Sequence, residues 1–538
     1  MTAAVENNVI SFLQKAARRV PDRPALIFGE GERASFADLW ERSDRISAGL
    51  GRAGLSPGDR VIVMIPMSLE LYAVMLGLLK LGAVAVFVDP WIGRKQIAAF
   101  AAFADPGGFA GIGKSHLLRL SEGRLRRIPV TLTTGGKLFR WPARLSLGDL
   151  QSQAGDGRVH AVTGDDPALI TFTSGSSGLP KGTNRTHRFL TAQHAALKHE
   201  FPVDDQDVDM PMFPVFALNN LALGIPSVVP QMDFLRVAEV DASVILRQMR
   251  DHGVTTSTAS PPFFDRLATQ VEAHPESHPR LRRILTGGAP VSDDQLRLWQ
   301  RSFPETEILV VYGSTEAEPV AHIHAAERLE ATNDVRPDSP GFCIGRPTDK
   351  VRTRVIRIVP DRVTPDDELD VAEHGIGELC VTGDHVCKDY FRNPDAVREN
   401  KLVEGDGTVW HRMGDTGYFD RRGRFWLVGR VHSTIVRGGV AVHPQMLEQS
   451  ADPGDARIRR VAAVGLPDAE LGERVVLVVE TSAGTGLRDE VEERMKRSGL
   501  IVDDIVLTSE PLPVDPRHNS KIDYPRLRSK LQKQSGNR

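Results

Sequence analysis

The residues best suited to chemistry lie between Ala168 and Thr186, where the sequence reads A-L-I-T-F-T-S-G-S-S-G-L-P-K-G-T-N-R-T. The apolar run Ala168–Ile170 predicts a buried strand that leads directly into hydroxyl side chains and glycines. Glycines let a backbone approach a bulky anion, and Lys181 adds a mobile positive charge. We therefore expect a phosphate-binding loop formed by Thr173, Ser174, Gly175, Ser176, Ser177, Gly178 and Lys181.

The spacing from Gly175 to Lys181 is close to that of a Walker A loop, but two positions differ. Pro180 precedes the lysine and Gly182 follows it, where that motif has a glycine and a magnesium-binding Ser or Thr. A standard P-loop NTPase is therefore disfavoured. A Ser- and Gly-rich surface linker is the other alternative, and the strand that feeds the loop argues against it.

Two further segments end in residues suited to binding a nucleotide. Residues 283–290 (R-I-L-T-G-G-A-P) and 308–316 (I-L-V-V-Y-G-S-T-E) each predict a strand followed by glycine. In open α/β sheets, ligands bind beyond the carboxyl ends of the strands. Tyr312 could stack on a nucleobase, and Glu316 could hold a magnesium ion against phosphates. The candidate contacts are Gly288, Ala289, Pro290, Tyr312, Gly313, Ser314 and Thr315.

A carboxylate suited to ribose follows in W-H-R-M-G-D-T-G-Y-F-D, which starts at Trp410. Gly414 and Gly417 bracket Asp415 and predict a tight loop around it. Its two oxygens could accept hydrogen bonds from both ribose hydroxyls. An ordinary turn aspartate is the alternative.

The stretch from Pro211 to Pro230 is nearly free of charge and rich in aromatic and branched side chains. Such a stretch could form the wall of a pocket for a hydrophobic substrate. Its composition is equally typical of an ordinary buried strand and helix.

The elements that must position these residues follow an alternating pattern. Helices are expected over 9–18, from Ser35, and over 68–81; strands are expected over 25–28, 61–65 and 83–88. The strand over 61–65 is apolar on both faces, as in a parallel sheet covered by helices, so we predict an α/β architecture. Residues 91–160 are less regular and predict a variable flap.

Short alternating strands follow Pro347, and Gly429–His432 is a candidate domain boundary. About a hundred residues remain after it, enough for one small α+β domain. We therefore expect an N-terminal domain over 1–430 and a small C-terminal domain over 431–538. Lys521 lies near the end of this second domain, in P-V-D-P-R-H-N-S-K-I.

Composition indicates a soluble, cytoplasmic protein. A formal net charge of −3 over 538 residues gives no sign of a nucleic-acid partner. Three cysteines, Cys343, Cys380 and Cys387, are too few to crosslink a chain of this size. The longest apolar stretch, 72–88, contains Lys80 and is too short for a transmembrane segment. No secretory signal is visible.

Together, the motifs F-T-S-G-S-S-G-L-P-K-G, T-G-G-A-P, Y-G-S-T-E, G-E-L-C-V-T-G, G-D-T-G-Y and L-V-G-R and the late lysine resemble the adenylate-forming superfamily of acyl-CoA synthetases, luciferases and nonribosomal adenylation domains. The resemblance implies a large N-terminal ATP- and acyl-binding domain over 1–430, with layered α/β sheets and a small β-barrel-like part. It also implies a small mobile α+β C-terminal lid domain over 431–538 that carries the catalytic lysine. It also implies roles for single residues: Thr173 to Lys181 would hold the ATP phosphates, Gly288 to Pro290 and Tyr312 would line the adenine, Glu316 would serve magnesium, Asp415 and Arg430 would bind ribose, and Lys521 would bridge the carboxylate and the α-phosphate. The implied catalytic residues are Lys521, Thr173 and Glu316.

Within that superfamily, F-P-V-F-A-L-N-N-L-A-L-G and D-P-R-H-N-S-K-I look like the olefin-pathway β-lactone synthetases, which close an activated 2-alkyl-3-hydroxy fatty acid on itself. Pro214 stands where the common family has histidine, and Ser520 where it often has glycine. In contrast, residues 431–444 look like ordinary acyl-CoA ligases, although His432 stands where an acid is usual. The resemblance implies ATP and Mg²⁺ as cofactors, CoA only for a ligase, a long-chain acyl carboxylate substrate, and possible partner enzymes of a hydrocarbon or lipid pathway.

Two other classes are disfavoured. A reductase or kinase with a nucleotide-binding fold lacks support because no G-x-G-x-x-G follows the first strand. A nucleotide-binding regulator without chemistry is disfavoured because Glu316 and Lys521 are both present.

Overall fold

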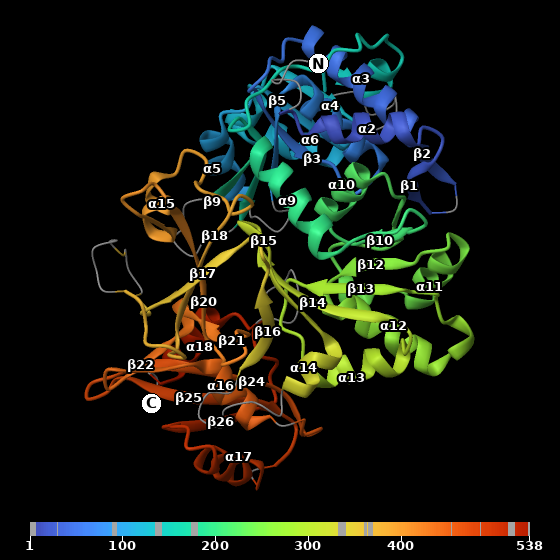
Figure 1. Ribbon diagram of the computed structural model, residues 1–538. Helices are drawn as coiled ribbons and strands as arrows, with labels where there is room; N and C mark the ends of the chain where they lie inside the picture. The colour runs from blue at the N-terminus through green and yellow to red at the C-terminus, as the bar shows by residue number, and fades with distance from the viewer. Residues whose placement is uncertain are drawn as a thin grey trace.

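The computed structural model describes residues 7–29, 31–88, 94–134, 143–173, 181–331, 341–359, 363, 369–452, 454–484, 486–514 and 522–535. In these residues the strands form three sheets of seven, fourteen and five strands (Figure 1). Helices cover the sheets, so the predicted layered α/β architecture is confirmed.

The seven-stranded sheet has the order β7-β6-β5-β3-β4-β8-β9. Its neighbouring strands are parallel, except for the antiparallel pair of β8 and β9. The strands are β3 (Arg60–Met64), β4 (Val84–Val88), β5 (Gly108–Gly111), β6 (Val130–Thr133), β7 (Leu145–Ser146), β8 (Pro167–Thr173) and β9 (Lys181–Thr186). The associated helices are α2 (Ile10–Arg19), α3 (Phe36–Arg52), α4 (Leu69–Leu81), α5 (Arg94–Ala104), α6 (Gly113–Ser121), α7 (Gly123–Arg126) and α8 (Leu147–Gln151). The variable flap expected over 91–160 is therefore wrong, because β5, β6 and β7 extend the parallel sheet.

Capping residues set the ends of the predicted helices. Ser35 and Asp38 form a reciprocal capping box at the start of α3. Ser68 caps the start of α4, and Gly82 ends it in the left-handed conformation at φ +76°. The burial of nearly all of α4 explains its long apolar sequence. Among the described residues, no helix has the length and apolar character needed to cross a membrane.

The fourteen-stranded sheet has the path β17-β18-β20-β21-β16-β15-β14-β13-β12-β10-β11-β1-β2, and β19 pairs with β20. The strands are β1 (Pro24–Phe28), β2 (Glu32–Ser35), β10 (Asp209–Pro211), β11 (Ser227–Val229), β12 (Thr256–Ala259), β13 (Arg283–Gly287), β14 (Glu307–Ser314), β15 (Ala317–His324), β16 (Phe342–Pro347), β17 (Arg352–Ile356), β18 (Gly377–Thr382), β19 (Lys401–Val403), β20 (Val409–Phe419) and β21 (Phe425–Arg430). The strands from β17 to β21 are the short strands expected after Pro347.

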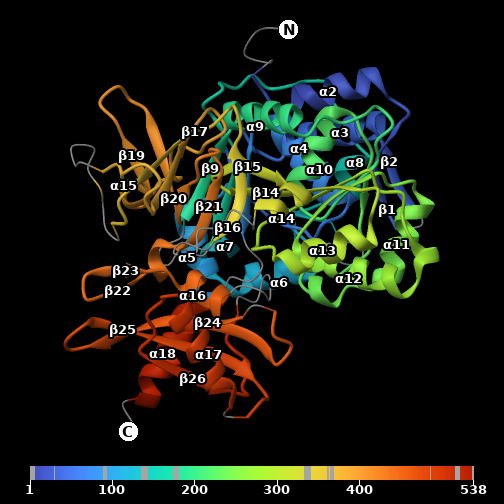
Figure 2. The same ribbon diagram turned by 60° about the horizontal axis from the view of Figure 1, so that its bottom comes forward.

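Helices lie on both sides of the parallel strands β12, β13 and β14. Figures 1 and 2 show α9 and α10 on one side and α11, α12 and α13 on the other. The helices of this part are α9 (His187–Glu200), α10 (Pro214–Leu223), α11 (Ala242–Asp251), α12 (Pro261–Ala273), α13 (Asp293–Ser302), α14 (Ala325–Ala331) and α15 (Pro394–Asn400). Both faces are therefore buried, which accounts for the apolar runs in β13 and β14.

The five-stranded sheet contains only residues that follow Arg430, as expected for a small C-terminal α+β domain. Its strands are β22 (Ile435–Arg437), β23 (Val440–Val442), β24 (Ile458–Asp468), β25 (Gly472–Thr481) and β26 (Asp504–Thr508), and its helices are α16 (Pro444–Ala451), α17 (Gly486–Arg497) and α18 (Tyr524–Ser535). Figure 2 shows these orange and red elements gathered together at the bottom of the view.

Candidate active site

The expected phosphate loop joins two adjacent strands. Thr173 at the end of β8 pairs with Lys181 at the start of β9. Ser174, Gly175, Ser176, Ser177 and Gly178 lie outside the described residues, and only the backbone of Thr173 is described. The Lys181 ammonium lies 3.5 Å from a Glu399 carboxylate oxygen and 3.5 Å from the Asn400 side-chain oxygen. The end of α15 therefore lies beside the start of β9.

The carboxyl ends of β13 and β14 lie side by side, because Gly287 pairs with Val311. A Cβ atom at Gly287 would lie 2.4 Å from the carbonyl oxygen of Val311, so no larger residue fits there. Gly288 has φ +79°, a conformation that favours glycine, and it turns the chain away from the strand. Gly288, Ala289 and Pro290 are exposed or half-buried at this strand end. A ligand beyond the sheet edge can reach them.

Tyr312, Asp415 and Arg430 form one hydrogen-bonded group. The Tyr312 hydroxyl donates to Asp415 Oδ2 over 2.5 Å, and Arg430 Nη1 donates to Asp415 Oδ1 over 2.6 Å. Burial, followed by the charge of Asp415, raises the pKa of Tyr312 well above its usual value. The nearby carboxylate of Asp415 raises the pKa of Arg430. The structure thus brings the three predicted residues together: the Asp415 carboxylate is paired with the Arg430 guanidinium and accepts a hydrogen bond from Tyr312.

The expectation that Asp415 lies in a tight loop is wrong. Asp415 lies within β20, directly opposite Arg430 of β21. Gly414 is accommodated in the strand at φ +67°, and the ladder shifts register just after Thr416. A strand holds the carboxylate more rigidly than a loop would, because both neighbouring strands constrain its backbone.

Glu378 of β18 supports this strand, and sequence reasoning missed it as a site residue. Its Oε1 accepts a hydrogen bond from the backbone N–H of Gly414 over 3.2 Å. Its Oε2 accepts from Arg412 Nε and Nη2 over 2.9 and 2.6 Å. Both side chains are buried, so the ion pair fixes the backbone next to Asp415. The motif G-E-L-C-V-T-G that contains Glu378 was the available signal.

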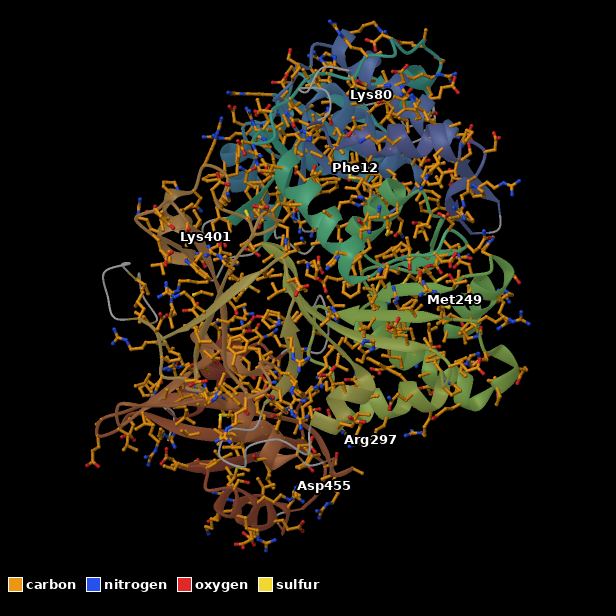
Figure 3. The ribbon with its side chains drawn as sticks, in the orientation of Figure 1. Phe12, Lys80, Met249, Arg297, Lys401 and Asp455 are labelled. Carbon is orange, nitrogen blue, oxygen red and sulfur yellow. The ribbon has the colours of Figure 1, made fainter. Side chains whose placement is uncertain are left out.

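Glu316 is held by a segment of the chain that sequence reasoning did not single out. The Tyr390 hydroxyl donates to Glu316 Oε1 over 3.1 Å, and the Cys387 N–H donates to the Glu316 carbonyl over 2.7 Å. The buried ammonium of Lys401, labelled in Figure 3, donates to the Cys387 carbonyl and lies 5.0 Å from the Tyr390 ring centre. Burial alone would raise the pKa of Glu316, but His411 and Lys401 lower it. The carboxylate is therefore held ionised.

Arg185 of β9 holds the same loop from the other side. Its Nε and Nη2 donate to the Thr315 carbonyl over 3.2 and 2.9 Å. Burial raises the pKa of Glu318 to about 7, although the positive charge of the buried Arg185 guanidinium opposes this rise. A buried arginine within K-G-T-N-R-T gave no sequence signal, because a polar run of this kind is typical of an exposed loop.

The comparison with known proteins decides the family. Residues 13–391, well over half of the chain, match the model of the AMP-binding enzyme family. The chain belongs to this family. Curated members similar to it include the olefin β-lactone synthetase of Stenotrophomonas maltophilia strain K279a, 33% identical with 97% of each chain covered. The olefin β-lactone synthetase of Xanthomonas campestris is 32% identical, covering 97% of this chain and 96% of the relative. The 4-coumarate–CoA ligase 5 of rice is 28% identical, covering 89% and 86%.

Solved structures of similar proteins agree on the fold. ATP-bound MatB from Rhodopseudomonas palustris superimposes with a TM-score of 0.80 at 22% identity, covering 98% of this chain and 99% of that one. The amide bond synthetase McbA from Marinactinospora thermotolerans gives 0.79 at 22% identity, covering 97% and 99%. This AMP-binding enzyme therefore has the adenylate-forming fold throughout its length.

A magnesium ion fits the surroundings of Glu316 in this AMP-binding enzyme. The described part of the chain contains no group of three or more His, Cys, Asp or Glu residues that could hold a metal. A single carboxylate suits magnesium, which usually keeps water and substrate phosphates as its other ligands. The lowered pKa of Glu316 keeps that carboxylate charged.

The stretch from Pro211 to Pro230 comprises β10, α10 and β11, so the alternative interpretation of a buried strand and helix is met, and its role as a substrate wall stays a prediction. Phe213 and Phe216 of this wall pack with Leu285, Leu309 and Val311 of β13 and β14. Val311 directly precedes Tyr312. The apolar surface of α10 thus continues to the strand end that carries Tyr312 and Glu316.

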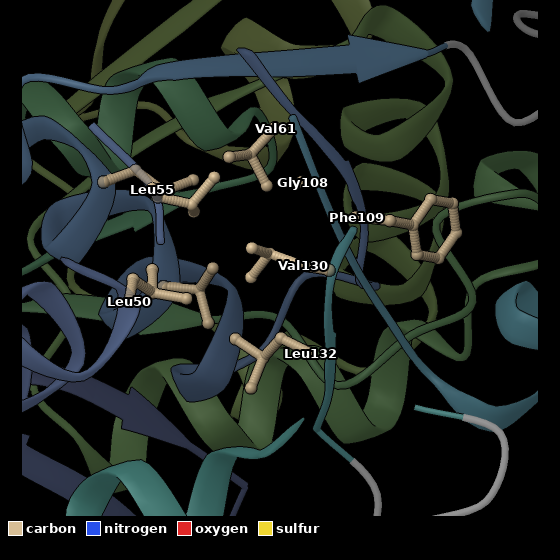
Figure 4. A pocket seen from close by; sticks show the side chains of 10 residues that line it. Leu50, Leu55, Val61, Gly108, Phe109, Val130 and Leu132 are labelled. Carbon is tan, nitrogen blue, oxygen red and sulfur yellow. The ribbon is translucent and has the colours of Figure 1, made fainter. Parts of the chain in front are cut away.

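The pocket in Figure 4 is a gap in the core and not a candidate ligand site of this AMP-binding enzyme. Apolar side chains and Gly108 line it, including Leu50, Val61 and Phe109. It offers no side chain that could bind a phosphate or a carboxylate. Lys521 lies outside the described residues, which end before it at Val514 and resume at Ile522.

Proposed function

We propose that this AMP-binding enzyme uses ATP to activate a 2-alkyl-3-hydroxy fatty acid as an acyl adenylate and then closes it to a β-lactone. The observation that supports this proposal most strongly is the similarity to two olefin β-lactone synthetases over 97% of the chain, at 33% and 32% identity. A fatty-acid–CoA ligase is the second candidate. It is favoured by the similarity to 4-coumarate–CoA ligases and by the sequence of residues 431–444.

In this proposal the candidate residues bind ATP along the ends of β8, β13 and β14. Gly288 to Pro290 and Tyr312 line the adenine. Gly313, Ser314 and Thr315, which follow Tyr312 in the chain, contact the nucleotide between the adenine and the phosphates. Asp415 and Arg430 bind the ribose, and the loop from Thr173 to Lys181 holds the phosphates. The hydrogen bond between Tyr312 and Asp415 supports this assignment, because it joins the adenine and ribose contacts.

In the first half-reaction, a substrate carboxylate oxygen attacks the α-phosphorus, and the bond to the pyrophosphate oxygen breaks. The negative charge that develops on the phosphates is neutralised by Lys181 and Lys521, which act where water is excluded. Thr173 donates a hydrogen bond to a phosphate oxygen. Glu316 would hold the magnesium ion, which would supply further positive charge beside the phosphates.

In the second half-reaction, the 3-hydroxyl oxygen attacks the acyl carbon, the bond to AMP breaks, and the hydroxyl proton leaves to solvent or to AMP. The attacking hydroxyl is part of the same molecule, so its effective concentration is high. This advantage offsets the strain of the four-membered ring. No external thiol is required.

The apolar surface of α10 would seat the alkyl chains. It is supported by the packing of Phe213 and Phe216 against the strand that carries Tyr312. Pro214 begins α10 without a side chain able to act on a thiol, whereas the resemblance places histidine there in the common family.

We further propose that residues 1–430 and 431–538 are separate domains and that the second is a mobile lid carrying Lys521. The separate five-stranded sheet supports this division. We place the enzyme in the cytoplasm, which suits its three free, buried cysteines. Enzymes of a hydrocarbon or lipid pathway are its proposed partners.

The decisive experiment analyses products by mass spectrometry with and without CoA. A 2-alkyl-3-hydroxy acid with ATP should give AMP, pyrophosphate and a β-lactone without CoA, and added CoA should not increase the rate. A simple fatty acid should stall as the adenylate, because it has no internal nucleophile. If AMP release requires CoA and the product is a thioester, the enzyme is an acyl-CoA ligase.

A further inference from the structure

One short region of the chain is strongly basic, although the whole protein is slightly acidic. Residues 113–145 contain eight Lys and Arg residues and a single acid, Glu122, while the whole chain has a formal net charge of −3. The region comprises α6, α7, β6 and the start of β7. Such a local excess of charge indicates a surface that meets an anionic partner.

Five exposed cations of this region form no ion pair with any acid that the structure describes. The side chains of Lys114, Arg124, Arg126, Arg127 and Arg144 are exposed, and none forms an ion pair in the part of the chain that the structure describes. The sequence between 135 and 142 contains no acid that could neutralise them. By contrast, exposed cations of α17 are paired, as Lys496 is with Glu492. The five cations of this region therefore differ from those of α17 in having no ion-pair partner among the described residues.

These cations belong to one surface. Arg119 of α6 donates from Nη1 to the carbonyl of Arg126 over 3.4 Å, which joins α6 to α7. Burial lowers the pKa of Arg119 most, and the positive charge of Arg144 lowers it further. Arg144, which directly precedes β7, therefore lies close to Arg119. Leu117 lies three residues after Lys114 on α6 and is 60% exposed. We name Lys114, Leu117, Arg124, Arg126, Arg127 and Arg144 the basic patch.

The basic patch lies at the β7 edge of the seven-stranded sheet. The strand order places β5, β3 and β4 between this edge and the β8–β9 edge, which carries the phosphate loop. None of the six residues of the patch belongs to the candidate ATP site.

We propose that the basic patch docks the enzyme on a membrane surface that carries anionic lipid headgroups. Basic residues near such a surface each strengthen binding roughly fivefold. An exposed apolar side chain among them can enter the boundary between headgroups and acyl chains, and Leu117 has this position. A nucleic acid or an acidic protein would match the charge but would leave Leu117 in water. The occupant that fits both features is a lipid surface.

Sedimentation of the full-length protein with vesicles tests the proposal. Vesicles that contain phosphatidylserine should carry the protein down, whereas vesicles of phosphatidylcholine alone should not, and high salt should release it. The triple variant Arg124→Gln, Arg126→Gln and Arg127→Gln should lower binding about 100-fold, at roughly fivefold for each charge. A matched control, Arg247→Gln, Arg266→Gln and Arg280→Gln, removes three exposed charges elsewhere and should bind like the wild type.

A second variant separates a membrane from other polyanions. Leu117→Ser should weaken binding to the anionic vesicles but leave binding to heparin unchanged. All of these variants should release pyrophosphate from a water-soluble acid at the wild-type rate, because none of the substituted residues is assigned to the binding of ATP or of the acid. The proposal is overturned if neutral and anionic vesicles bind equally, if the control triple loses as much as the patch triple, or if only heparin binds.

Discussion

Replacing Asp415 by alanine removes the carboxylate that joins Tyr312 to Arg430. In the free protein this carboxylate accepts hydrogen bonds of 2.5 and 2.6 Å from those two side chains. Each oxygen of an ionised carboxylate can accept a second hydrogen bond, so both ribose hydroxyls can bind without displacing the protein donors. The substitution therefore removes a ribose contact and leaves two protein donors without their acceptor.

The structure separates the cost to ATP binding from the cost to folding. Hydrogen bonds to a charged group contribute about 1.5 to 3 kcal/mol, so ATP affinity should fall roughly 10- to 150-fold. The Arg430 side chain is 51% exposed and remains solvated, so losing its ion pair costs at most about 1 kcal/mol. The Tyr312 hydroxyl loses its acceptor in a mostly buried position, which costs about 1 to 3 kcal/mol of folding stability. Asp415→Ala should thus fold with a modestly lowered Tm.

A cycle with 2′-deoxy-ATP isolates the ribose contact. Calorimetry should show that the wild type binds ATP more tightly than 2′-deoxy-ATP. In Asp415→Ala this preference should disappear, because the acceptor of the 2′-hydroxyl is gone. Tyr312→Phe is the control, since it retains the carboxylate and should retain the preference.

The same measurements can refute the assignment. If Asp415→Ala weakens ATP and 2′-deoxy-ATP equally, the carboxylate acts only by holding Tyr312 and Arg430. If ATP affinity does not change at all, Asp415 has no part in binding the nucleotide.

Three further predictions follow from buried or remote groups. Tyr390→Phe removes one hydrogen-bond donor to Glu316 and should raise the Mg²⁺ concentration needed for ATP binding by about 10-fold or more. ATP affinity measured in EDTA should not change. An unchanged Mg²⁺ dependence would count against this prediction. Burial raises the pKa of Glu448 to about 7, above its ordinary value in the unfolded chain, so ionising it costs stability as pH rises from 4.5 through about 7. Glu448→Gln should therefore gain up to about 3 kcal/mol near pH 8 and flatten the dependence of Tm on pH; an equal Tm in both proteins near pH 8 would contradict it. Lys521→Ala should abolish pyrophosphate release and leave ATP affinity nearly unchanged, and a parallel loss of ATP affinity would assign Lys521 to nucleotide binding instead.

Local patterns were sufficient to predict most of the N-terminal elements and the strand ends that carry the candidate site. The short strands expected after Pro347 include β18, whose run of apolar residues is bounded by glycines. The helix expected from 68 to 81 is α4, because its capping serine and final glycine are local signals. Such signals depend on neighbours within a few residues.

The features that sequence missed depend on distant partners. β9 carries the polar sequence K-G-T-N-R-T, and Arg185 is buried there only because the Thr315 carbonyl, 130 residues away, accepts its hydrogen bonds. Tyr390 reaches Glu316 across 74 residues. β5 is a strand of G-F-A-G, whose glycines weaken the strand pattern. No local pattern could reveal these contacts.

The parts of the candidate site are joined through side chains that need not touch a substrate. The Phe391 N–H donates to the Gly182 carbonyl, which ties the segment next to Tyr390 to the strand leaving the phosphate loop. Tyr390 then reaches Glu316, and Arg185 joins that same strand to Thr315. β9, which begins at Lys181, and the turn that carries Glu316 are therefore braced against each other at two points. Because each brace crosses between them, a shift of either segment must strain one of these hydrogen bonds, and this keeps the spacing between β9 and Glu316 fixed.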